Sequence, residues 1–286
     1  RWAPCAENPA LECGKLFVPV DYRQPHGAKV ALAVIRAKAL DPGRRIGVLF
    51  SHTGGHASGV DFVLAAHPAP AFVRLRQRFD VISLDPRGAG RSRPFKCGFN
   101  LPDVPADQGD ASLISYYDDY ARRVAAQCLD HDRAFVLSIS GNNFARDIEL
   151  LRRALGEPQL SFGMMSNSGP VAAVYATMFP QQVRAMAIDS PVGPDFDDYA
   201  IERITEQSAS YETALRRIDQ LCRRDPGCRL QKPGVVAAYD KLAARLQASP
   251  VTMPNGQAFD ARSLSFAFFT LLPQEAGHPE FRINGV

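Results

Sequence analysis

The chain has 286 residues, of which 46% are hydrophobic and 22% charged, a balance typical of globular proteins rather than of disordered or fibrous ones. Lysine and arginine exceed aspartate and glutamate by only three (33 against 30), and the charges are scattered, so no nucleic-acid partner is expected. The longest apolar runs fall far short of the roughly 18 residues of a membrane-spanning helix, so we expect no membrane segment here.

The N-terminal third begins with two strand-like segments, KLFVPVDY and KVALAVIRAKA, separated by the turn formers Pro25 and Gly27. They predict an antiparallel hairpin. The apolar run IGVLFS then predicts a buried strand, followed by the loop HTGGHASG, a helix and a second buried strand, FDVISLD. This order of strand, helix and strand indicates the beginning of a parallel sheet.

The middle of the chain continues this alternation. NNFARDIELLRRALGEP predicts a helix, because glycine and proline follow its end and four apolar residues recur at helical spacing: Phe144, Ile148, Leu151 and Leu155. A strand (QLSFGMM), a sharp turn at Ser166, a helix (GPVAAVYATMF) and another buried strand (VRAMAID) come next. The sequence therefore predicts an α/β fold with a mostly parallel sheet covered on both faces.

The pattern changes after Pro194 to two long helical stretches, a small hairpin at TMPNGQAF and a final apolar helix beginning near Ala261. We interpret residues 195–286 as a helical cap, or lid, over the mouth of the sheet. Residues 1–194 then form the N-terminal part of the core.

The six cysteines indicate disulfides, because their number is even and they fall into close pairs: Cys5 with Cys13, Cys97 with Cys128, and Cys222 with Cys228. The short loops lack the CxxC spacing of redox motifs and zinc sites, so no metal site is expected. The alternative is six buried free thiols in a cytosolic protein. The polar, proline-containing surroundings favour disulfides, and hence a secreted or periplasmic protein.

The stretch SFGMMSNSGPVAAVYATMFP places Ser166 between a strand and a helix, the order of a nucleophile elbow. Such a turn normally needs small residues two positions before and after the serine. Ser168 is small and Met164 is not, which would cost about 1–3 kcal/mol unless neighbours move. The competing interpretation is that Ser166 caps the following helix.

These segments together resemble the secreted tripeptidyl-aminopeptidase and prolyl-iminopeptidase group of α/β-hydrolases (peptidase S33 type). The resemblance covers nearly the whole chain and rests on order, spacing and residue types in five segments: CGKLFVPVDYRQP, SHTGGHASGVDFV, FDVISLDPRGAGRSRPF, NNFARDIELLRRALGEPQLSFGMMSNSG and YATMFPQQVRAMAIDSPVGP. It implies an α/β-hydrolase fold with a lid, the same disulfide pairing, a catalytic Ser166 and no cofactor.

The resemblance also implies an oxyanion loop at residues 52–56, with the N–H groups of Gly54 and Asn167 as oxyanion-hole donors. The departures from the family lie in this region. Met164 and Ser168 replace glycines on either side of the serine, and the loop replaces a proline-containing glycine run with Thr53, Gly55 and His56. We expect four residues to line the pocket: His52, His56, Met164 and Met165. Asp85 and Arg87 of the intact motif DPRGAGRS are expected to anchor loops.

A histidine base oriented by a carboxylate follows the lid in this fold, and none of the six histidines stands at the expected place. The C-terminal part of the core is therefore expected on a second chain or a C-terminal fragment of the same precursor.

Three functions remain open from the sequence. The first is a secreted serine peptidase, aminopeptidase-like, acting on a small molecule or short peptide. The second is an enzyme of the same fold redirected to another reaction on a small metabolite. The third is a non-catalytic binding protein.

Overall fold

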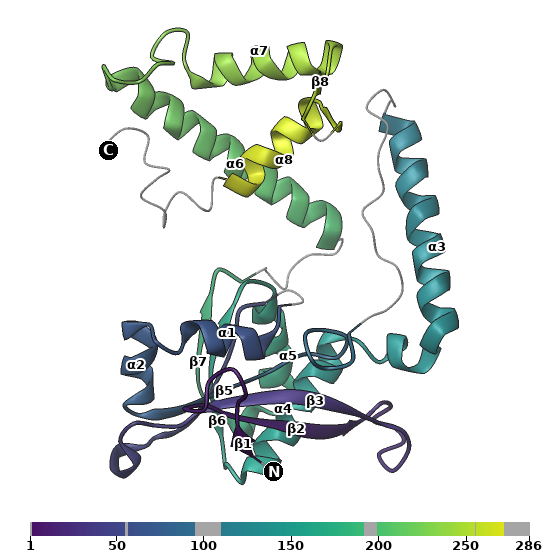
Figure 1. Ribbon diagram of the computed structural model, residues 1–286, viewed down its shortest axis with the longest axis vertical. Coiled ribbons are helices and arrows are strands. Elements are labelled where there is room, and N and C mark those ends of the chain that lie inside the picture. Colours follow the sequence, from purple (N-terminus) through teal and green to yellow (C-terminus); the bar gives the residue numbers. More distant parts are fainter. Residues whose placement is uncertain (1, 55–56, 95–109, 192–198, 255, 272–286) are drawn as a thin grey trace. The chain divides into compact units, whose positions relative to one another are not determined.

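The computed structural model describes the chain except for residues 1, 55–56, 95–109, 192–198, 255 and 272–286. The chain divides into two compact units (Figure 1). One comprises Arg1–Leu101 and Tyr117–Asp195, and the other Pro102–Tyr116 and Phe196–Val286. The first unit carries the seven-stranded sheet.

The first unit is built on a seven-stranded sheet with the order β1-β2-β3-β5-β4-β6-β7. The strands in this order are β1 (Ala3–Pro4), β2 (Glu12–Pro19), β3 (Lys29–Ala37), β5 (Phe79–Leu84), β4 (Gly47–His52), β6 (Leu160–Met165) and β7 (Val183–Asp189). The first three strands are antiparallel, and β3 is antiparallel to β5. The strands β5, β4, β6 and β7 run parallel. The predicted N-terminal hairpin and mostly parallel sheet are thus confirmed.

One face of the sheet is covered by α1 (Gly59–Ala66) and α2 (Pro70–Arg76). Because side chains alternate along a strand, Leu49 of β4 points to this face and packs in one cluster with Val63 and Phe72. The sequence predicted a single helix between β4 and β5, but the structure has two. Separate helices form because Pro70 begins a new helix two residues after another proline.

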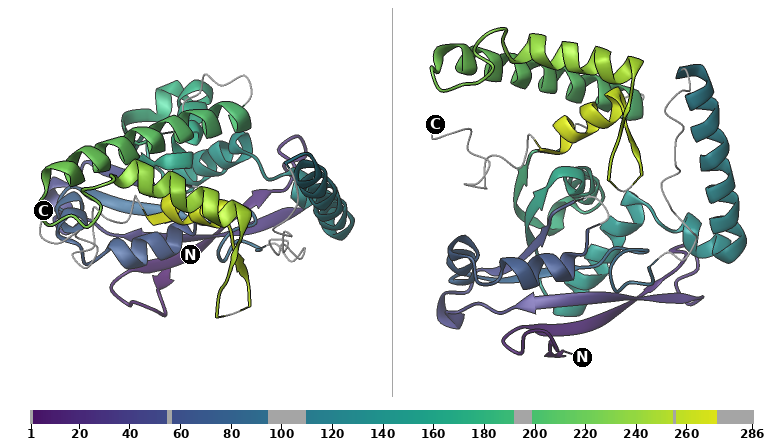
Figure 2. Two further views of the ribbon diagram at one scale, coloured as in Figure 1. Left: turned by 90° about the horizontal axis from the view of Figure 1, so that it is seen from above. Right: turned by 45° about the horizontal axis from the view of Figure 1, so that its top comes forward.

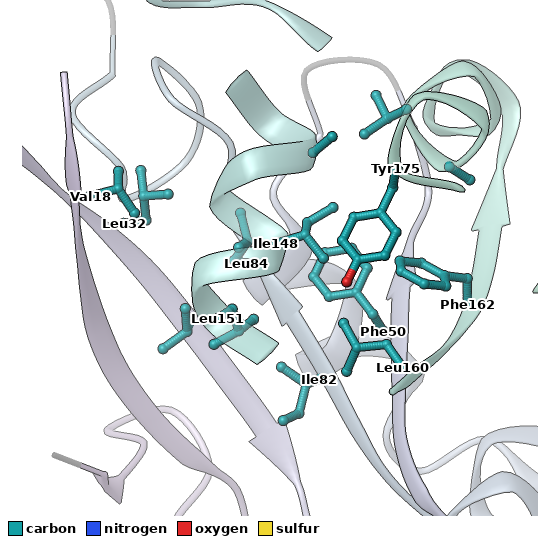
Figure 3. Packing of buried hydrophobic residues seen from close by; sticks show 14 of the residues in the cluster. Val18, Leu32, Phe50, Ile82, Leu84, Ile148, Leu151, Leu160, Phe162 and Tyr175 are labelled. Carbon is teal, nitrogen blue, oxygen red and sulfur yellow. The ribbon is translucent and has the colours of Figure 1, made fainter. Parts of the chain in front are cut away.

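The opposite face is covered by α4 (Gly141–Leu155) and α5 (Gly169–Met178). Phe50 points to this side, where Figure 3 shows it beside Ile148 and Tyr175. The ring centroids of Tyr175 and Phe162 lie 4.7 Å apart. The sequence prediction for α4 is confirmed together with its C-terminal signal, since Gly156 ends the helix at φ 72°. Ser140, which the sequence analysis did not mark, caps its start.

The strand β7 corrects one prediction, because the run VRAMAID is a strand but is not buried. Most of its residues are exposed, and Ile188 is 37% exposed. The reason is its place in the sheet: β7 is the last strand in the described order and hydrogen-bonds only to β6 there. Its apolar composition is that of an interior strand, whereas its position is that of an edge.

The helix α3 (Asp110–Leu137), of which residues 110–116 belong to the second unit, was not predicted from the sequence. It is interrupted at Asp132, where the backbone leaves the helical region (φ −160°, ψ 82°). The Asp132 carboxylate accepts a hydrogen bond from the N–H of Phe135 at 3.1 Å, and so restarts the helix after the break. Three short 3₁₀ turns complete the first unit: η1 (Pro42–Arg44), η2 (Ser166–Ser168) and η3 (Pro180–Gln182).

The second unit is mainly helical, with α6 packed on α7 and α7 on α8 (Figures 1 and 2). Its elements are α6 (Tyr199–Arg224), α7 (Val235–Ala248), β8 (Val251–Thr252), β9 (Ala258–Phe259) and α8 (Ala261–Leu271). The strands β8 and β9 are antiparallel, which confirms the small hairpin expected from the sequence. That this unit acts as a cap stays a prediction.

Candidate active site

Ser166 lies in the turn between the end of β6 and the start of α5. Its backbone φ is +52°, in the left-handed region that side-chain-bearing residues rarely adopt. Such a conformation costs of the order of 1–3 kcal/mol and persists where the surrounding structure enforces it, often at functional sites. The side chain is exposed, and within the described part of the chain no hydrogen bond involves its hydroxyl. Among those residues Ser166 therefore does not act as a helix cap, the competing interpretation.

Ser168 is the serine whose hydroxyl is used locally. It is 2% exposed and accepts a hydrogen bond from the N–H of Met165 at 3.0 Å. Its oxygen also lies 2.9 Å from the carbonyl oxygen of His52 and 2.6 Å from that of Met165. The sequence marked Ser168 only as a departure from glycine and missed these contacts.

His52, expected in the pocket, is completely buried at the end of β4. Its Nδ1 accepts a hydrogen bond from the N–H of Gly54 at 3.0 Å, which places the ring proton on Nε2. The ring packs edge-on against Phe144, with centroids 5.4 Å apart. Burial lowers the pKa of His52 to about 4, and the Ala57 backbone and the Asp85 charge offset only part of this. His52 is thus a neutral group at physiological pH.

Gly54, one of the two predicted oxyanion-hole donors, packs directly on the turn that holds Ser166. Its φ is +91°, and a Cβ added there would lie 2.5 Å from the carbonyl oxygen of Met165 and 2.8 Å from the nitrogen of Asn167. The structure therefore brings Gly54 and Asn167 together. It also shows that the Gly54 N–H is engaged with His52.

The two methionines before Ser166 lie in different surroundings. Met164 is 1% exposed and belongs to the apolar core between the sheet and α4 and α5. Met165 is half-buried. His56, the fourth residue expected in the pocket, lies outside the described residues.

Asp85 joins the oxyanion loop to the motif DPRGAGRS. Its Oδ1 accepts hydrogen bonds from Ser58 Oγ at 2.7 Å and from the N–H of Val60 at 2.9 Å. Its Oδ2 accepts from the N–H of Arg91 at 2.6 Å. The predicted anchoring role of Asp85 is confirmed, because these bonds fix the start of α1 directly after the loop.

Arg87 forms a buried ion pair with Asp147 of α4, through Nε–Oδ2 and Nη2–Oδ1 distances of 2.8 Å. The guanidinium also donates to the carbonyl oxygens of Val20 and Pro19. Burial alone would lower the pKa of Arg87, but the hydrogen bonds and charge of Asp147 outweigh it, so the pKa is raised. Arg87 therefore anchors its loop to α4 and β2, as predicted.

Two of the predicted disulfides are present, Cys5–Cys13 and Cys222–Cys228, with Cα atoms 5.0 and 5.3 Å apart. Cys97 lies outside the described residues, so its bond to Cys128 stays a prediction. In the described ranges, no group of histidine, cysteine and acidic side chains is arranged to hold a metal ion. The helices described also include none whose length and apolar character would let it cross a membrane.

The chain is similar to several known proteins. A family profile described as alpha/beta hydrolase fold matches residues 48–232. The chain is 32% identical over 286 residues to "Serine protease Hip1" of Mycobacterium tuberculosis, covering 93% of this chain and 54% of that protein. It is 30% identical over 223 residues to "Tripeptidyl aminopeptidase" of Streptomyces lividans, covering 74% and 42%. It therefore spans about half the length of the curated relatives it matches.

Two further proteins are similar to this chain, one named as an esterase and one a solved structure of low sequence identity. "Carboxylesterase B" of Mycobacterium tuberculosis is 32% identical over 276 residues, covering 93% of this chain and 51% of that protein. Among solved structures, the proline iminopeptidase of Mycobacterium smegmatis is 16% identical with a TM-score of 0.41, covering 91% of this chain and 68% of that one.

Proposed function

Because the chain belongs to the alpha/beta hydrolase fold family, we propose that it is part of a serine hydrolase in which Ser166 is the nucleophile. The observation that carries this proposal is the backbone of Ser166, which has a φ of 52° between a parallel strand and a helix. In a nucleophile elbow this conformation exposes the hydroxyl above the carboxyl ends of the strands. Relatives named as a serine protease and a tripeptidyl aminopeptidase support short peptides as the substrate class.

The proposed reaction is acyl transfer to the serine. Ser166 Oγ attacks the acyl carbon while its proton passes to a base, and the carbonyl oxygen becomes an oxyanion. Collapse of this intermediate breaks the bond to the leaving group, which departs with the proton, and water then hydrolyses the acyl-enzyme. Backbone N–H groups of Asn167 and the Gly54 loop are the proposed oxyanion donors. Gly54 can serve only by exchanging its bond to His52.

His52 does not fit the role of the base. Its Nδ1 accepts the Gly54 N–H, its ring is buried, and a pKa of about 4 makes it a weak proton acceptor at neutral pH. The base and its carboxylate are instead supplied by a polypeptide segment beyond these 286 residues. The relatives support this, because the chain covers only about half of their length.

The edge of β7 is the proposed contact for that segment. An exposed apolar edge strand is a site for pairing with another strand, and a monomer in water rarely leaves one open. β7 carries exposed Ala185, Ala187 and Ile188, and hydrogen-bonds to β6 alone in the described sheet. The proposed occupant is the C-terminal remainder of the same precursor. Intact-mass and denaturing-gel analysis tests this, because a single active species with the mass of these 286 residues would contradict it.

The proposed location is outside the cytoplasm, secreted or periplasmic. Two disulfides within the described residues support it, because disulfides persist in oxidising compartments.

A fluorophosphonate probe, which reacts covalently with activated serines, tests the nucleophile. We expect peptide mass mapping of the natively purified protein to find the adduct on Ser166, and Ser166→Ala to abolish labelling. Ser190→Ala is the matched control, because Ser190 is also exposed, directly follows a parallel strand and has a positive φ of 49°. Labelling at another serine, or unchanged labelling of Ser166→Ala, would reject the proposal.

A second candidate is an enzyme of this fold that acts on a small metabolite by a different reaction. The engaged Gly54 amide favours it, since the oxyanion donor is not preset in this structure. Product analysis separates the two candidates: peptide cleavage supports the first. A protein that is labelled at Ser166 but cleaves no acyl substrate supports the second. Absence of any labelling favours a binding protein.

A further inference from the structure

The hydroxyl of Ser168 occupies the junction between the turn at Ser166 and the end of β4. We propose that Ser168 is a positioning residue, which ties the Ser166 turn to the oxyanion loop through His52. This inference rests on the proposed function of Ser166 as the nucleophile. It assigns a specific task to a residue at which the chain departs from the glycine of the related peptidases.

The first part of the tie is the bond between the two strand ends. In the parallel ladder of β4 and β6, His52 is the partner of Met164, and no further pair follows. Met165 lies one residue beyond this end, and its N–H donates a hydrogen bond to Ser168 Oγ at 3.0 Å. The hydroxyl has one proton, which it shares between the carbonyl oxygens of His52 at 2.9 Å and Met165 at 2.6 Å. The hydroxyl thus continues the connection where the backbone ladder stops.

The second part runs through His52 to the loop. The backbone carbonyl of His52 contacts Ser168, whereas its ring nitrogen Nδ1 holds the N–H of Gly54. Gly54 in turn packs against the carbonyl oxygen of Met165, where an added Cβ would lie only 2.5 Å away. The contacts therefore form a closed circuit of Ser168, His52, Gly54 and Met165. A displacement of any one of them moves the backbone next to Ser166.

Burial makes this circuit specific. Ser168 is 2% exposed and His52 is fully buried, so water does not replace a lost partner at no cost. If the Ser168 hydroxyl is removed, the N–H of Met165 and the carbonyl oxygen of His52 each lose their hydrogen bond to it. The turn at Ser166 already has an unfavourable φ of 52°, and it relaxes most readily when such a restraint is lost. The expected consequence is a misplaced nucleophile in a folded protein.

The test measures covalent labelling of Ser166 by a fluorophosphonate, separating the maximal inactivation rate constant kinact from the half-saturating concentration KI. For Ser168→Ala we expect kinact to fall about tenfold, the scale of a small misplacement of a reacting group, with KI within about twofold of the wild type. Ser168→Gly, which also lacks the hydroxyl, is expected to show the same fall in kinact and a similar KI. The matched control is Ser161→Ala, which removes a buried hydroxyl of β6 bound to Arg184 Nε at 2.7 Å. It should leave kinact unchanged.

The outcomes separate this inference from the function beneath it. If wild-type protein is not labelled at Ser166, the proposed nucleophile fails. If wild-type protein is labelled and Ser168→Ala or Ser168→Gly reacts within about twofold of it, the positioning role is overturned while the nucleophile stands. An equal loss in Ser161→Ala also overturns it, because the effect is then general destabilisation. Should neither Ser168 variant fold, amide exchange in the wild type decides: a Met165 N–H as fast as solvent-exposed amides rejects the tie, and a strongly protected one supports it.

Discussion

The buried pair of Arg87 and Asp147 allows a quantitative prediction for the stability of the sheet unit. Their side chains are 2% and 0% exposed, and two parallel hydrogen bonds of 2.8 Å join them. The Tyr22 hydroxyl adds a third bond to Asp147 at 2.6 Å. The change considered is Asp147→Asn, which keeps the shape of the side chain and removes its charge. The Arg87 cation then stays buried without a counter-charge, and an amide N–H₂ faces hydrogen-bond donors.

The expected loss follows from this burial. Removing one partner of a buried ion pair costs about 3–5 kcal/mol, a large share of the roughly 5–15 kcal/mol that stabilise a typical domain. For a unit of this size that corresponds to a decrease of about 6–20 °C in the melting temperature. Arg87→Met with Asp147→Leu should recover much of the loss, because it removes both charges together.

The assay is urea unfolding followed by tryptophan fluorescence. Trp2 is the single tryptophan of the chain and lies in the sheet unit, 4.5 Å from the Arg36 guanidinium, so its signal reports on that unit. The matched control is Asp118→Asn. Asp118 pairs with Arg122 in an exposed position, so this substitution should lower the unfolding free energy by less than about 1 kcal/mol. The reasoning is refuted if Asp147→Asn costs no more than this control.

Three further predictions follow from the same structure. Gly54→Ala should cost about 2 kcal/mol in unfolding free energy and slow labelling of Ser166, because the φ of Gly54 is +91° and its Cβ would meet a backbone oxygen. Gly43→Ala should be tolerated, because its φ lies outside the left-handed region and an added Cβ would make only an ordinary contact of 3.5 Å with Asp41 Oδ1. Burial raises the pKa of Glu149, but hydrogen bonds from arginine and tyrosine outweigh it and lower the pKa to about 2. The stability contributed by this carboxylate is therefore present above about pH 5 and lost towards pH 2. The free-energy difference between wild type and Glu149→Gln should shrink over that range, and a constant difference would contradict this. Replacing Cys222 and Cys228 by alanine should destabilise the helical unit by about 2–3 kcal/mol, measured by calorimetry, and reductant should then have no further effect through this pair.

The sequence was sufficient for the parts of the fold that local patterns determine. The apolar runs that became β4 and β5 and the helical period of α4 are each contained in one segment. Their ends are also set by local residues, such as Ser140 at the start of α4 and Gly156 beyond its end. No contact with a distant part of the chain is needed to recognise them.

Burial and irregular helices were harder to predict because they depend on neighbours. The composition of β7 fits an interior strand, but whether a strand is interior depends on which other strand pairs with it. The helix α3 is broken at Asp132, and its apolar and polar residues are less clearly separated onto two faces than those by which the sequence revealed α4. Local composition alone could therefore predict neither the exposure of β7 nor the helix α3.

In the candidate site, the order of strand, serine and helix was enough to locate Ser166 and to expect a sharp turn there. The partners of Ser168 were not predictable, because His52 is 116 residues away in the sequence and reaches it only through the pairing of β4 with β6. The same holds for Gly54, whose fit against Met165 depends on the path of the loop after β4.

The altered residues around Ser166 show how this turn forms without glycine on either side. Met164 was expected to crowd the turn, yet its side chain is buried in the core, where its contacts offset the expected cost. Ser168 adds a side chain where glycine would allow close approach, and its hydroxyl bonds both strand ends. The positive φ of Ser166 therefore persists through packing on one side and hydrogen bonding on the other. A change that removes either support should alter the reactivity of Ser166 more than it alters the fold.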